Sequence, residues 1–510
     1  MSTPPRGVSG GDPNRGLITA SIMLATVMNS LDTTIANVAL PHMAGSVSAS
    51  ADQITWVLTS YIVASAIMTP MTGWLANRFG RKLVFMTAII GFTVASALCG
   101  AATSLGQIVI FRLLQGAFGA ALVPLSQAVL MDVYPPEEQG PAMAIWGMGA
   151  ILGPIVGPAL GGWLTDAFSW RWVFYINLPL GLLAGLGVFF FIHDRPQEGR
   201  TPFDFTGFAL LSLTIGAFQL FLDRGDNKAW FESTEIWIEA SVAGIALILF
   251  IFHTLTADRP FIPLALFKDR NFASATMFGF FVGVLMFATL ALLPPMLETL
   301  MGYPVVTTGL VTMPRGVGSL LSMFIVGRMI NRVDTRLMVG IGLVLSSLAL
   351  LGMSGFSLQM DSRLVVTMGL LQGVGIGLVF VPLTTLGFAT LDGRYRADGA
   401  GVFTLMRNLG ASVGISIMQA LLSSNTQKVH SRLIEGLTNG PGGPPPAPFS
   451  LTNPAGIAAL EGEVSRQSAM VAYIDDFKMM FILGIAVLPL LLFMRPPRRG
   501  GGGAPHVAME

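Results

Sequence analysis

The sequence is poor in charge and has almost no cysteine. Of its 510 residues, 11% are charged, whereas roughly 25% are charged in a soluble globular protein. The single cysteine, Cys99, excludes an internal disulfide bond and a metal site made of cysteines. The net charge of +1 gives no support to a nucleic-acid partner. Since 53% of the residues are hydrophobic and they gather in long blocks, the composition predicts an all-α integral membrane protein.

Features typical of enzyme sites are also missing. The sequence has no nucleophile motif, no phosphate-binding loop and no histidine cluster. An integral membrane enzyme would need a catalytic pair or a metal cluster at a membrane face. We therefore predict that the chain is not an enzyme and holds no metal ion. The histidines stand singly, without the spacing of metal ligands, and are interpreted as loop or helix-end residues: His42, His193, His253, His430 and His506.

Fourteen apolar runs are long enough to cross a bilayer, which takes roughly 20 apolar residues. The first run follows a polar segment, 1–16, interpreted as a flexible cytoplasmic tail, and it is too long for the core of a signal peptide. The predicted spans are 17–40, 53–76, 83–101, 107–130, 141–163, 172–192, 205–222, 235–254, 272–294, 306–327, 337–356, 364–388, 398–422 and 477–494.

The basic residues orient these spans, because cytoplasmic loops are enriched in lysine and arginine. With a cytoplasmic N-terminus, 18 of the 29 lysine and arginine residues fall in inner segments and 8 in outer segments. Both termini, including the tail 496–510, are therefore predicted to be cytoplasmic. The three basic residues that remain lie within spans: Arg112, Arg315 and Arg407.

The longest loop, 423–476, is then external. Its GPGGPPPAP stretch at 440–448 is incompatible with a helix. Two short segments flank this stretch, 427–438 and 455–470, and carry apolar residues at helical spacing. We interpret them as a packed extracellular cap. The alternative is that they lie on the outer membrane surface or contact a partner.

The chain repeats itself. GWLANRFGRKL at 73–83 lines up with GRMINRVDTRL 254 residues later, and LLQG at 113–116 recurs 257 residues later. GPIVG at 153–157 lines up with GASVG, again at an offset of 257. The repeat predicts two parallel six-helix bundles, 17–194 and 271–495, with an inserted helix pair at 204–255. Such halves, which rock about a central cavity, are the major-facilitator arrangement.

Asp32 places a carboxylate inside the first span. A charge in the middle of a membrane helix costs about 2.5–3.5 kcal/mol on insertion scales, and such residues are usually functional. Desolvation favours the protonated carboxyl, whereas a nearby arginine favours the ionised one. Asp32 and Arg112 of the same half are therefore the predicted proton- or cation-coupling pair. The alternative is that Asp32 stays ionised against Arg112 and only holds helices together.

A substrate cavity between the halves is predicted to have polar lining residues. Asn29 shares a helical face with Asp32. Unpaired arginines in a cavity suit anionic groups; the alternative is that they donate to backbone carbonyls at broken helices. No acid lies in the middle of the five spans between 272 and 422, which disfavours a second cation site. The candidates are Asn29, Tyr61, Gln115, Arg315 and Arg407.

The tight loop after the second span is a candidate gate. Its basic side chains can reach acids at neighbouring helix ends, and ion pairs of this kind can form in one conformational state and break in another. Its glycines permit close approach or a positive φ. A topology signal alone is the alternative. The predicted gating residues are Gly73, Asn77, Arg78, Gly80, Arg81 and Asp132.

The span 141–163 is rich in glycine and proline. Glycines supply a small-residue face for close packing, and prolines remove backbone hydrogen bonds and allow bending. We predict that this helix packs against the opposite half and resists leakage. Its central residues are Gly153, Pro154, Gly157 and Pro158.

Six stretches together resemble the 14-helix drug:proton antiporters of the major facilitator superfamily, of the EmrB/QacA type. The resemblance covers about 17–495. One departure is Asn77, which stands where the inner-loop motif of the superfamily often has aspartate. The stretches are LDTTIANVALP (31–41), WVLTSYIVASAIMTPMTGWLANRFGRK (56–82), RLLQGAFGAALVPLSQAVLMDVYPPE (112–137), GPIVGPALGGWL (153–164), SWRWVFYINLPLG (169–181) and LMRNLGASVGIS (405–416).

The resemblance implies a multidrug efflux transporter of the cytoplasmic (inner) membrane, involved in multidrug resistance. It implies small hydrophobic toxic substrates, exchange for protons with Asp32 as a proton or cation site, and the proton motive force in place of any cofactor. In Gram-negative relatives it also implies a periplasmic membrane-fusion adaptor and an outer-membrane channel. A rival on the same fold is a dedicated exporter of a single metabolite, siderophore or lipid-like anion. A proton-driven importer is a further alternative.

Overall fold

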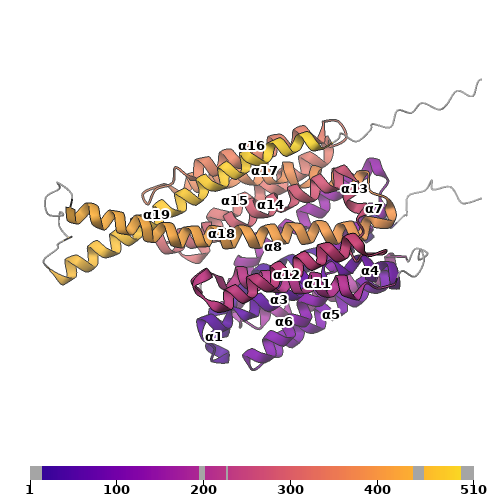
Figure 1. Ribbon diagram of the computed structural model, residues 1–510, viewed down its shortest axis with the longest axis horizontal. Helices are drawn as coiled ribbons and strands as arrows, with labels where there is room; N and C mark the ends of the chain where they lie inside the picture. The colour runs from indigo at the N-terminus through magenta and orange to yellow at the C-terminus, as the bar shows by residue number, and fades with distance from the viewer. Residues whose placement is uncertain (1–13, 194–201, 226–227, 440–448, 450–452, 495–510) are drawn as a thin grey trace, which may run out of the picture.

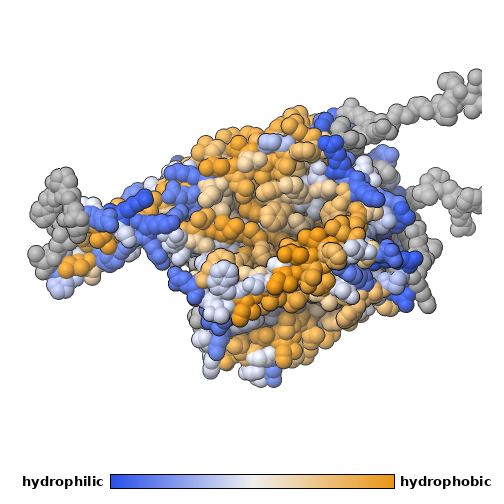
Figure 2. All heavy atoms as spheres, in the orientation of Figure 1, coloured by the Kyte–Doolittle hydropathy of each residue, from blue (hydrophilic) through white to orange (hydrophobic). Residues whose placement is uncertain are grey.

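The computed structural model describes residues 14–193, 202–225, 228–439, 449 and 453–494. Every regular element in these ranges is helical, and twelve helical segments are long and apolar enough to span a membrane. On the face shown in Figure 2, apolar residues form a broad belt across the body and hydrophilic residues lie at its two ends. This is the surface of a multi-pass membrane protein. Most of the predicted N-terminal tail, the tail after residue 495 and the stretch 440–448 lie outside the described residues.

The first six predicted spans form one set of packed helices. They are α1 (Arg15–Val47), α2 (Ala51–Ile54), α3 (Trp56–Met68), α4 (Met71–Phe79), α5 (Arg81–Ala101), α6 (Leu105–Gly119), α7 (Leu122–Val133), α8 (Pro136–Ala167), α9 (Trp172–Tyr175) and α10 (Asn177–Phe191). Contacts join α1 to α8 and α10, α3 to α6, and α5 to α6 and α10. These helices are called the first half below.

Two of these spans are interrupted where a proline follows. The second span breaks at Thr69 and Pro70, between α3 and α4. The fourth breaks between Gly119 and Leu122, and Pro124 lies in the first turn of α7. Proline lacks an amide hydrogen and its ring clashes with the preceding turn, so the helix hydrogen bonds cannot run on through these points.

The last six predicted spans form a second set, the second half. They comprise α13 (Ala265–Lys268), α14 (Arg270–Pro295), the π-turn η3 (Met296–Leu300), α15 (Val305–Met329), α16 (Thr335–Met353), α17 (Ser362–Ala389), η4 (Gly393–Tyr395), α18 (Arg396–Asn439), α19 (Pro454–Val487) and η5 (Leu488–Phe493). Their packing repeats that of the first half. Helix α14 pairs with α18 as α1 does with α8, and α15 pairs with α17 as α3 does with α6.

An inserted pair, α11 (Phe205–Gly225) and α12 (Thr234–Thr256), is joined through the short η2 (Trp230–Glu232). Helix α11 contacts α3 of the first half and α18 of the second half. Asp204 caps α11 by accepting from the amide of Gly207, and it also binds the ring of His253 at 2.9 Å. Burial alone raises the pKa of Asp204, but these bonds and one from the Phe261 amide outweigh it and lower that pKa below its ordinary value.

Two predicted spans, 17–40 and 53–76, fall outside the twelve apolar segments. Helix α1 occupies the first range, and α3 with α4 occupies the second. Helix α1 carries Asn29, Ser30 and Asp32 near its middle, which lowers its hydropathy. The second span is divided into pieces that are each shorter than a full crossing. The total of fourteen crossings therefore stays a prediction.

The predicted external loop, 423–476, is largely helical, which differs from the prediction of two separate short segments. Helix α18 continues to Asn439 and α19 begins at Pro454. Figure 1 shows them as a two-helix hairpin that projects beyond the body of the molecule. The reason is local, because no proline occurs from 396 to 440 or from 455 to 488. Nothing in the sequence stops either helix at the membrane surface.

The prediction that α8 packs against the opposite half is confirmed, because α8 contacts α15 and α17 of the second half. Its central glycines pack against α1 of its own half, which the sequence did not predict. A Cβ atom on Gly153 or Gly157 would overlap Ser30 or Thr34 of α1. Glycine lets the two backbones approach at these positions. Another side of α8 does reach the second half, where Ile155 packs on α15.

Proline in α8 adds hydrogen bonds to the same interface. Pro154 has no amide hydrogen, which leaves the carbonyl of Ala150 without its helical donor. Ser30 Oγ donates to that carbonyl at 2.6 Å. Thr34 Oγ1 donates to the carbonyl of Gly153 at 3.1 Å. Helices α1 and α8 are therefore joined on both sides of the level of Asp32.

Candidate functional site

Asp32 is fully buried among hydrogen-bond donors from α6 and α10. Its Oδ2 accepts from Arg112 Nη1 at 2.6 Å. Its Oδ1 accepts from Gln115 Nε2 at 2.8 Å and from Asn177 Nδ2 at 2.9 Å. Neither Asp32 nor Arg112 is accessible to solvent. These three donors, one of which is the guanidinium of Arg112, satisfy both oxygens of the carboxylate.

Arg112 is held as firmly as its partner. Its Nε donates to the carbonyl of Val57 at 3.0 Å, and its Nη1 also lies 2.9 Å from Gln115 Oε1. The guanidinium carbon lies 4.2 Å from the centre of the Tyr61 ring, which adds a cation–π contact. The pair is neutral as a whole, so removing either member would leave a buried charge without compensation.

Tyr61 connects Asn29 to this network. Its hydroxyl donates to Asn29 Oδ1 at 2.9 Å. The structure therefore joins all the polar residues that the sequence predicts for the first half. Asp32, Arg112 and Gln115 contact one another, Tyr61 packs on Arg112, and Asn29 joins through Tyr61.

Asn177 and Ser96 complete the network, and the sequence analysis missed both. Asn177 Nδ2 lies 3.0 Å from Ser96 Oγ, which in turn donates to the carbonyl of Phe174 at 2.8 Å. Each is a polar residue inside an apolar span, which is the signal that points to them. Asn177 reaches Asp32 directly and Ser96 joins through Asn177, and these contacts form only when α1, α5 and α10 are packed together.

The arrangement can respond to a single proton. An ionised Asp32 accepts from three side chains and balances Arg112, whereas a protonated carboxyl loses its attraction for the guanidinium. Protonation would therefore weaken the contact between α1 and α6 at the level of Asp32.

Arg315 and Arg407 lie elsewhere, in the second half. Arg315 Nη2 donates to a backbone carbonyl, that of Met286 in α14, at 2.7 Å, although this carbonyl is not one of those freed by Pro294 and Pro295. The Arg407 guanidinium lies 5.7 Å from the ring centre of Phe380, and its buried Nε has no hydrogen-bond partner in the described part of the chain. Neither arginine forms an ion pair with a described carboxylate.

Charged side chains from both halves meet at the inner-loop end, which we define as the end of the bundle that carries residues 78–82. Arg81 and Asp132 form an ion pair there, as the gating interpretation requires. Arg396 of α18 lies 3.0 Å from Asp132 Oδ1 and donates to the carbonyl of Met131 at 3.2 Å. Because Arg396 belongs to the second half, this cluster joins the halves.

Asn77 faces a carboxylate from the second half, Asp398, which the sequence analysis missed. Asn77 Nδ2 lies 3.4 Å from Asp398 Oδ2. A Cβ atom on Gly73 would overlap the Asp398 side chain, so this close approach requires glycine. Gly80 has a φ of +92°, the positive value expected for the turn. Arg78 forms no ion pair with another described residue. The loop therefore contacts a carboxylate of the second half, although its own residue 77 is an asparagine and not an aspartate.

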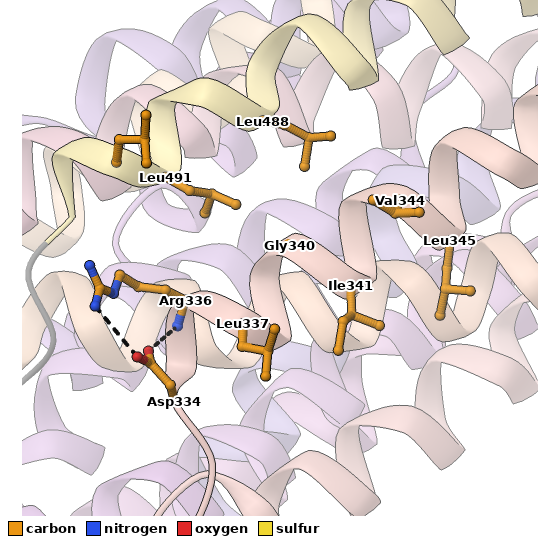
Figure 3. Close-up of a pocket in the computed structure, with 10 residues that line it drawn as sticks. Asp334, Arg336, Leu337, Gly340, Ile341, Val344, Leu345, Leu488 and Leu491 are labelled. Carbon is orange, nitrogen blue, oxygen red and sulfur yellow. Dashed lines mark hydrogen bonds and ion pairs between the residues drawn. The ribbon is translucent and has the colours of Figure 1, made fainter.

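A groove of about 560 Å³ opens on the outside of the second half, between α16 and η5 (Figure 3). Leu337, Ile341 and Leu488 are among the apolar side chains that line it. At one end Asp334 caps α16 and lies 3.5 Å from Arg336. None of the network residues of the first half lines this groove, so we do not place the functional site there.

Comparison with known proteins places these features in a family. The family model described as Major Facilitator Superfamily matches residues 22–415. Fatty acid resistance protein FarB of Neisseria gonorrhoeae is 36% identical over 504 residues, covering 95% of this chain and 97% of that protein. Multidrug export protein EmrB of Escherichia coli K12 is 34% identical over 508 residues, covering 96% and 98%.

Solved structures share the fold at low sequence identity. The proton:xylose symporter XylE has a TM-score of 0.63 and 13% identity, covering 95% of this chain and 96% of that one. The human organic anion transporter MFSD10 has a TM-score of 0.60 and 14% identity, covering 92% and 100%. At these identities the likeness concerns the fold alone.

Proposed function

We propose that this chain, which belongs to the major facilitator superfamily and to its EmrB-type branch, exports hydrophobic toxic compounds in exchange for protons. The buried pair of Asp32 and Arg112 carries this proposal. It supplies one titratable group at membrane depth, held by side chains from several helices of one half. The names of relatives such as EmrB support multidrug export as the activity.

Alternating access needs a gate at each end of the substrate path. Three sets of contacts between the halves lie at the inner-loop end: Arg396 with Asp132, Asp398 with Asn77, and Asn331 with the carbonyl of Glu137 at 2.7 Å. They support the interpretation of this conformation as one with a closed inner gate. Orientation from the basic residues makes this end cytoplasmic, so the conformation is one that releases substrate outward.

Coupling follows from the position of Asp32 on α1. A proton that arrives from outside neutralises the carboxylate and releases Arg112, which frees α1 from α6. Ser30 and Thr34 hold α1 to α8 just above and below that level, and α8 contacts α15 of the other half through Ile155. A change at Asp32 therefore has a continuous packed path to the interface that must rock.

A dedicated exporter of one metabolite, siderophore or lipid-like anion is the second candidate. The observation that favours it is a second half in which buried Arg315 and half-buried Arg407 are not paired with any described carboxylate. FarB, a relative of this chain whose name refers to fatty acid resistance, also fits this class of cargo. A drug panel and competition by a single metabolite separate the two candidates.

The location and partners follow from the same proposal. The protein lies in the cytoplasmic membrane with both termini inside, uses the proton motive force and needs no cofactor. Helix α18 has 44 residues and is thus about 66 Å long, whereas the apolar core of a bilayer is about 30 Å thick. The hairpin of α18 and α19 therefore extends well beyond the membrane on the outer side. It is the surface within reach of a periplasmic adaptor that leads to an outer-membrane channel.

The test uses inverted membrane vesicles with an acidic interior. Addition of a substrate should release protons from vesicles that contain the wild-type chain. A panel of lipophilic cations and uncharged drugs should give responses to several members if the protein is a multidrug exporter. Responses to none of them, but to one anionic metabolite, would favour the dedicated exporter.

A further inference from the structure

The two halves contain the same contact between their first and fourth spans. In the first half, Gln115 of α6 donates to Asp32 of α1 at 2.8 Å. In the second half, Gln372 of α17 donates to Thr289 of α14 at 3.1 Å. Both members of the second contact stand 257 residues after those of the first, which is the offset of the LLQG repeat. Thr289 therefore occupies the position of Asp32.

The second spans repeat the match. A Cβ atom on Gly116 would collide with the carbonyl oxygen of Tyr61, and one on Gly373 would collide with the carbonyl oxygen of Arg315. Arg315 stands 254 residues after Tyr61, which is the offset of the repeated inner loop. Arg315 thus occupies the position of the tyrosine that covers Arg112.

The first-span partners of these two residues also correspond. Tyr61 donates to the side chain of Asn29 at 2.9 Å, and Arg315 donates to the carbonyl of Met286 at 2.7 Å. Met286 stands 257 residues after Asn29. Three contacts on three pairs of helices therefore agree on one superposition of the halves.

The charges at equivalent positions are very different. The first half has a carboxylate and a guanidinium, Asp32 and Arg112, which balance each other. In the second half these positions hold Thr289 and Gly369, and a guanidinium enters from Arg315 instead. Because the residue equivalent to Arg112 is Gly369, no side chain enters the second half from this position. The site of the second half thus keeps a positive charge and has lost the internal anion.

Within the described part of the chain the side chain of Arg315 donates one hydrogen bond, which does not account for its burial. The side chain has 8% of its surface exposed, and a guanidinium carries five N–H donors, of which one meets Met286. Pro294 and Pro295 free the carbonyls of residues 290 and 291, which lie one turn beyond Met286. Arg315 is therefore not needed to satisfy a carbonyl at the helix break. A buried, uncompensated charge is costly, and a bound anion offsets that cost.

We propose that Arg315 binds the anionic head group of amphiphilic substrates, at the position in the second half where the first half has its own carboxylate. The substrate class is a long-chain monoanion such as a carboxylate. The inference rests on the proposed export function and adds its selectivity. In this arrangement Asp32 of the first half exchanges protons, and Arg315 of the second half binds the acidic group of the substrate.

The test measures binding by the purified full-length chain in nanodiscs of phosphatidylcholine at neutral pH. Radiolabelled dodecanoate is the anionic probe, and dodecyltrimethylammonium is the cationic probe of the same chain length. Arg315→Gln should weaken dodecanoate binding about ten- to a hundredfold, the range expected for a lost charge-assisted contact. Binding of the cation should change less than about twofold. Arg315→Lys should keep part of the dodecanoate affinity because it keeps the charge.

Arg328→Gln is the matched control, since it removes an exposed guanidinium from the same helix, α15, at a position outside the repeated contacts. Equal loss of dodecanoate binding in this variant would overturn the assignment to Arg315. Unchanged dodecanoate binding in Arg315→Gln, or equal loss of both probes, would also overturn it. Loss of dodecanoate binding after phosphatidylglycerol is added to the discs would assign the site to a lipid head group and not to substrate.

The failure of this inference differs from failure of the proposed function. A wild-type chain that binds the cation but not dodecanoate overturns the anion site and leaves drug export standing. A wild-type chain that binds dodecanoate through Arg315, yet moves no protons with any drug or with dodecanoate, supports the site and overturns proton-coupled export.

Discussion

Replacement of Asp32 by asparagine tests the coupling site most directly. The variant leaves Arg112 buried without its counter-charge. Two charges about 4 Å apart at an effective dielectric constant of about 20 attract each other by about 4 kcal/mol, and loss of one partner of a buried pair costs about 3–5 kcal/mol. The asparagine has one acceptor oxygen for the three donors that the carboxylate satisfies. The NH2 group of the introduced asparagine must therefore face one of these three donors.

Two effects are expected from this variant. Thermal unfolding of Asp32→Asn should occur at a lower temperature than that of the wild type, because of the unpaired guanidinium. In inverted vesicles with an acidic interior, the wild type should release protons when a substrate is added and the variant should not. The second effect follows because an amide has no proton to exchange in this pH range.

The control separates stability from coupling. The double variant Asp32→Asn/Arg112→Gln removes both charges, so it should be more stable than either single variant and still show no substrate-evoked proton release. Proton release that persists in a folded Asp32→Asn protein would refute the role of Asp32 in coupling and leave it a structural role. Recovery of proton release in the double variant would refute it as well.

Three further predictions concern packing and charge away from that site. Asp398→Asn removes the acid at the closed inner gate, so alkylation of the buried reporter Ile330→Cys, which faces α8 at the same end, should become about fivefold faster, equivalent to about 1 kcal/mol. An unchanged rate would exclude Asp398 from the gate, and the buried Cys99 keeps the background low. Gly157→Ala should destabilise the protein by about 1–3 kcal/mol in denaturant unfolding, because the new Cβ meets α1. The matched Gly162→Ala has room and should be close to neutral, and equal effects would contradict this account. Asp204 has a lowered pKa, so its stabilising effect is present above the unfolded pKa of about 3.9 and is lost as pH falls through the folded value. The difference in melting temperature between wild type and Asp204→Asn should therefore shrink in acid, and a difference independent of pH would contradict the assignment.

The sequence alone was sufficient for features that depend on local composition. Apolar runs predict where helices form because each run must satisfy its own backbone hydrogen bonds in the bilayer. The repeat predicts two similar halves, and helix packing in the structure follows it. The pairing of Arg81 with Asp132 was also predictable, since short inner loops bring oppositely charged helix ends together.

Only the tertiary structure decided which residues meet across helices. Asn177 and Asp398 became partners of Asp32 and Asn77 through the angle and register of packed helices, which no local pattern encodes. The glycine face of α8 was readable in the sequence, yet its partner α1 was not, because close packing suits any neighbour with small side chains. The equivalence of Arg315 with Tyr61 required the same information. It rests on backbone approaches at glycines, and a sequence shows that a glycine is present but not which backbone it admits.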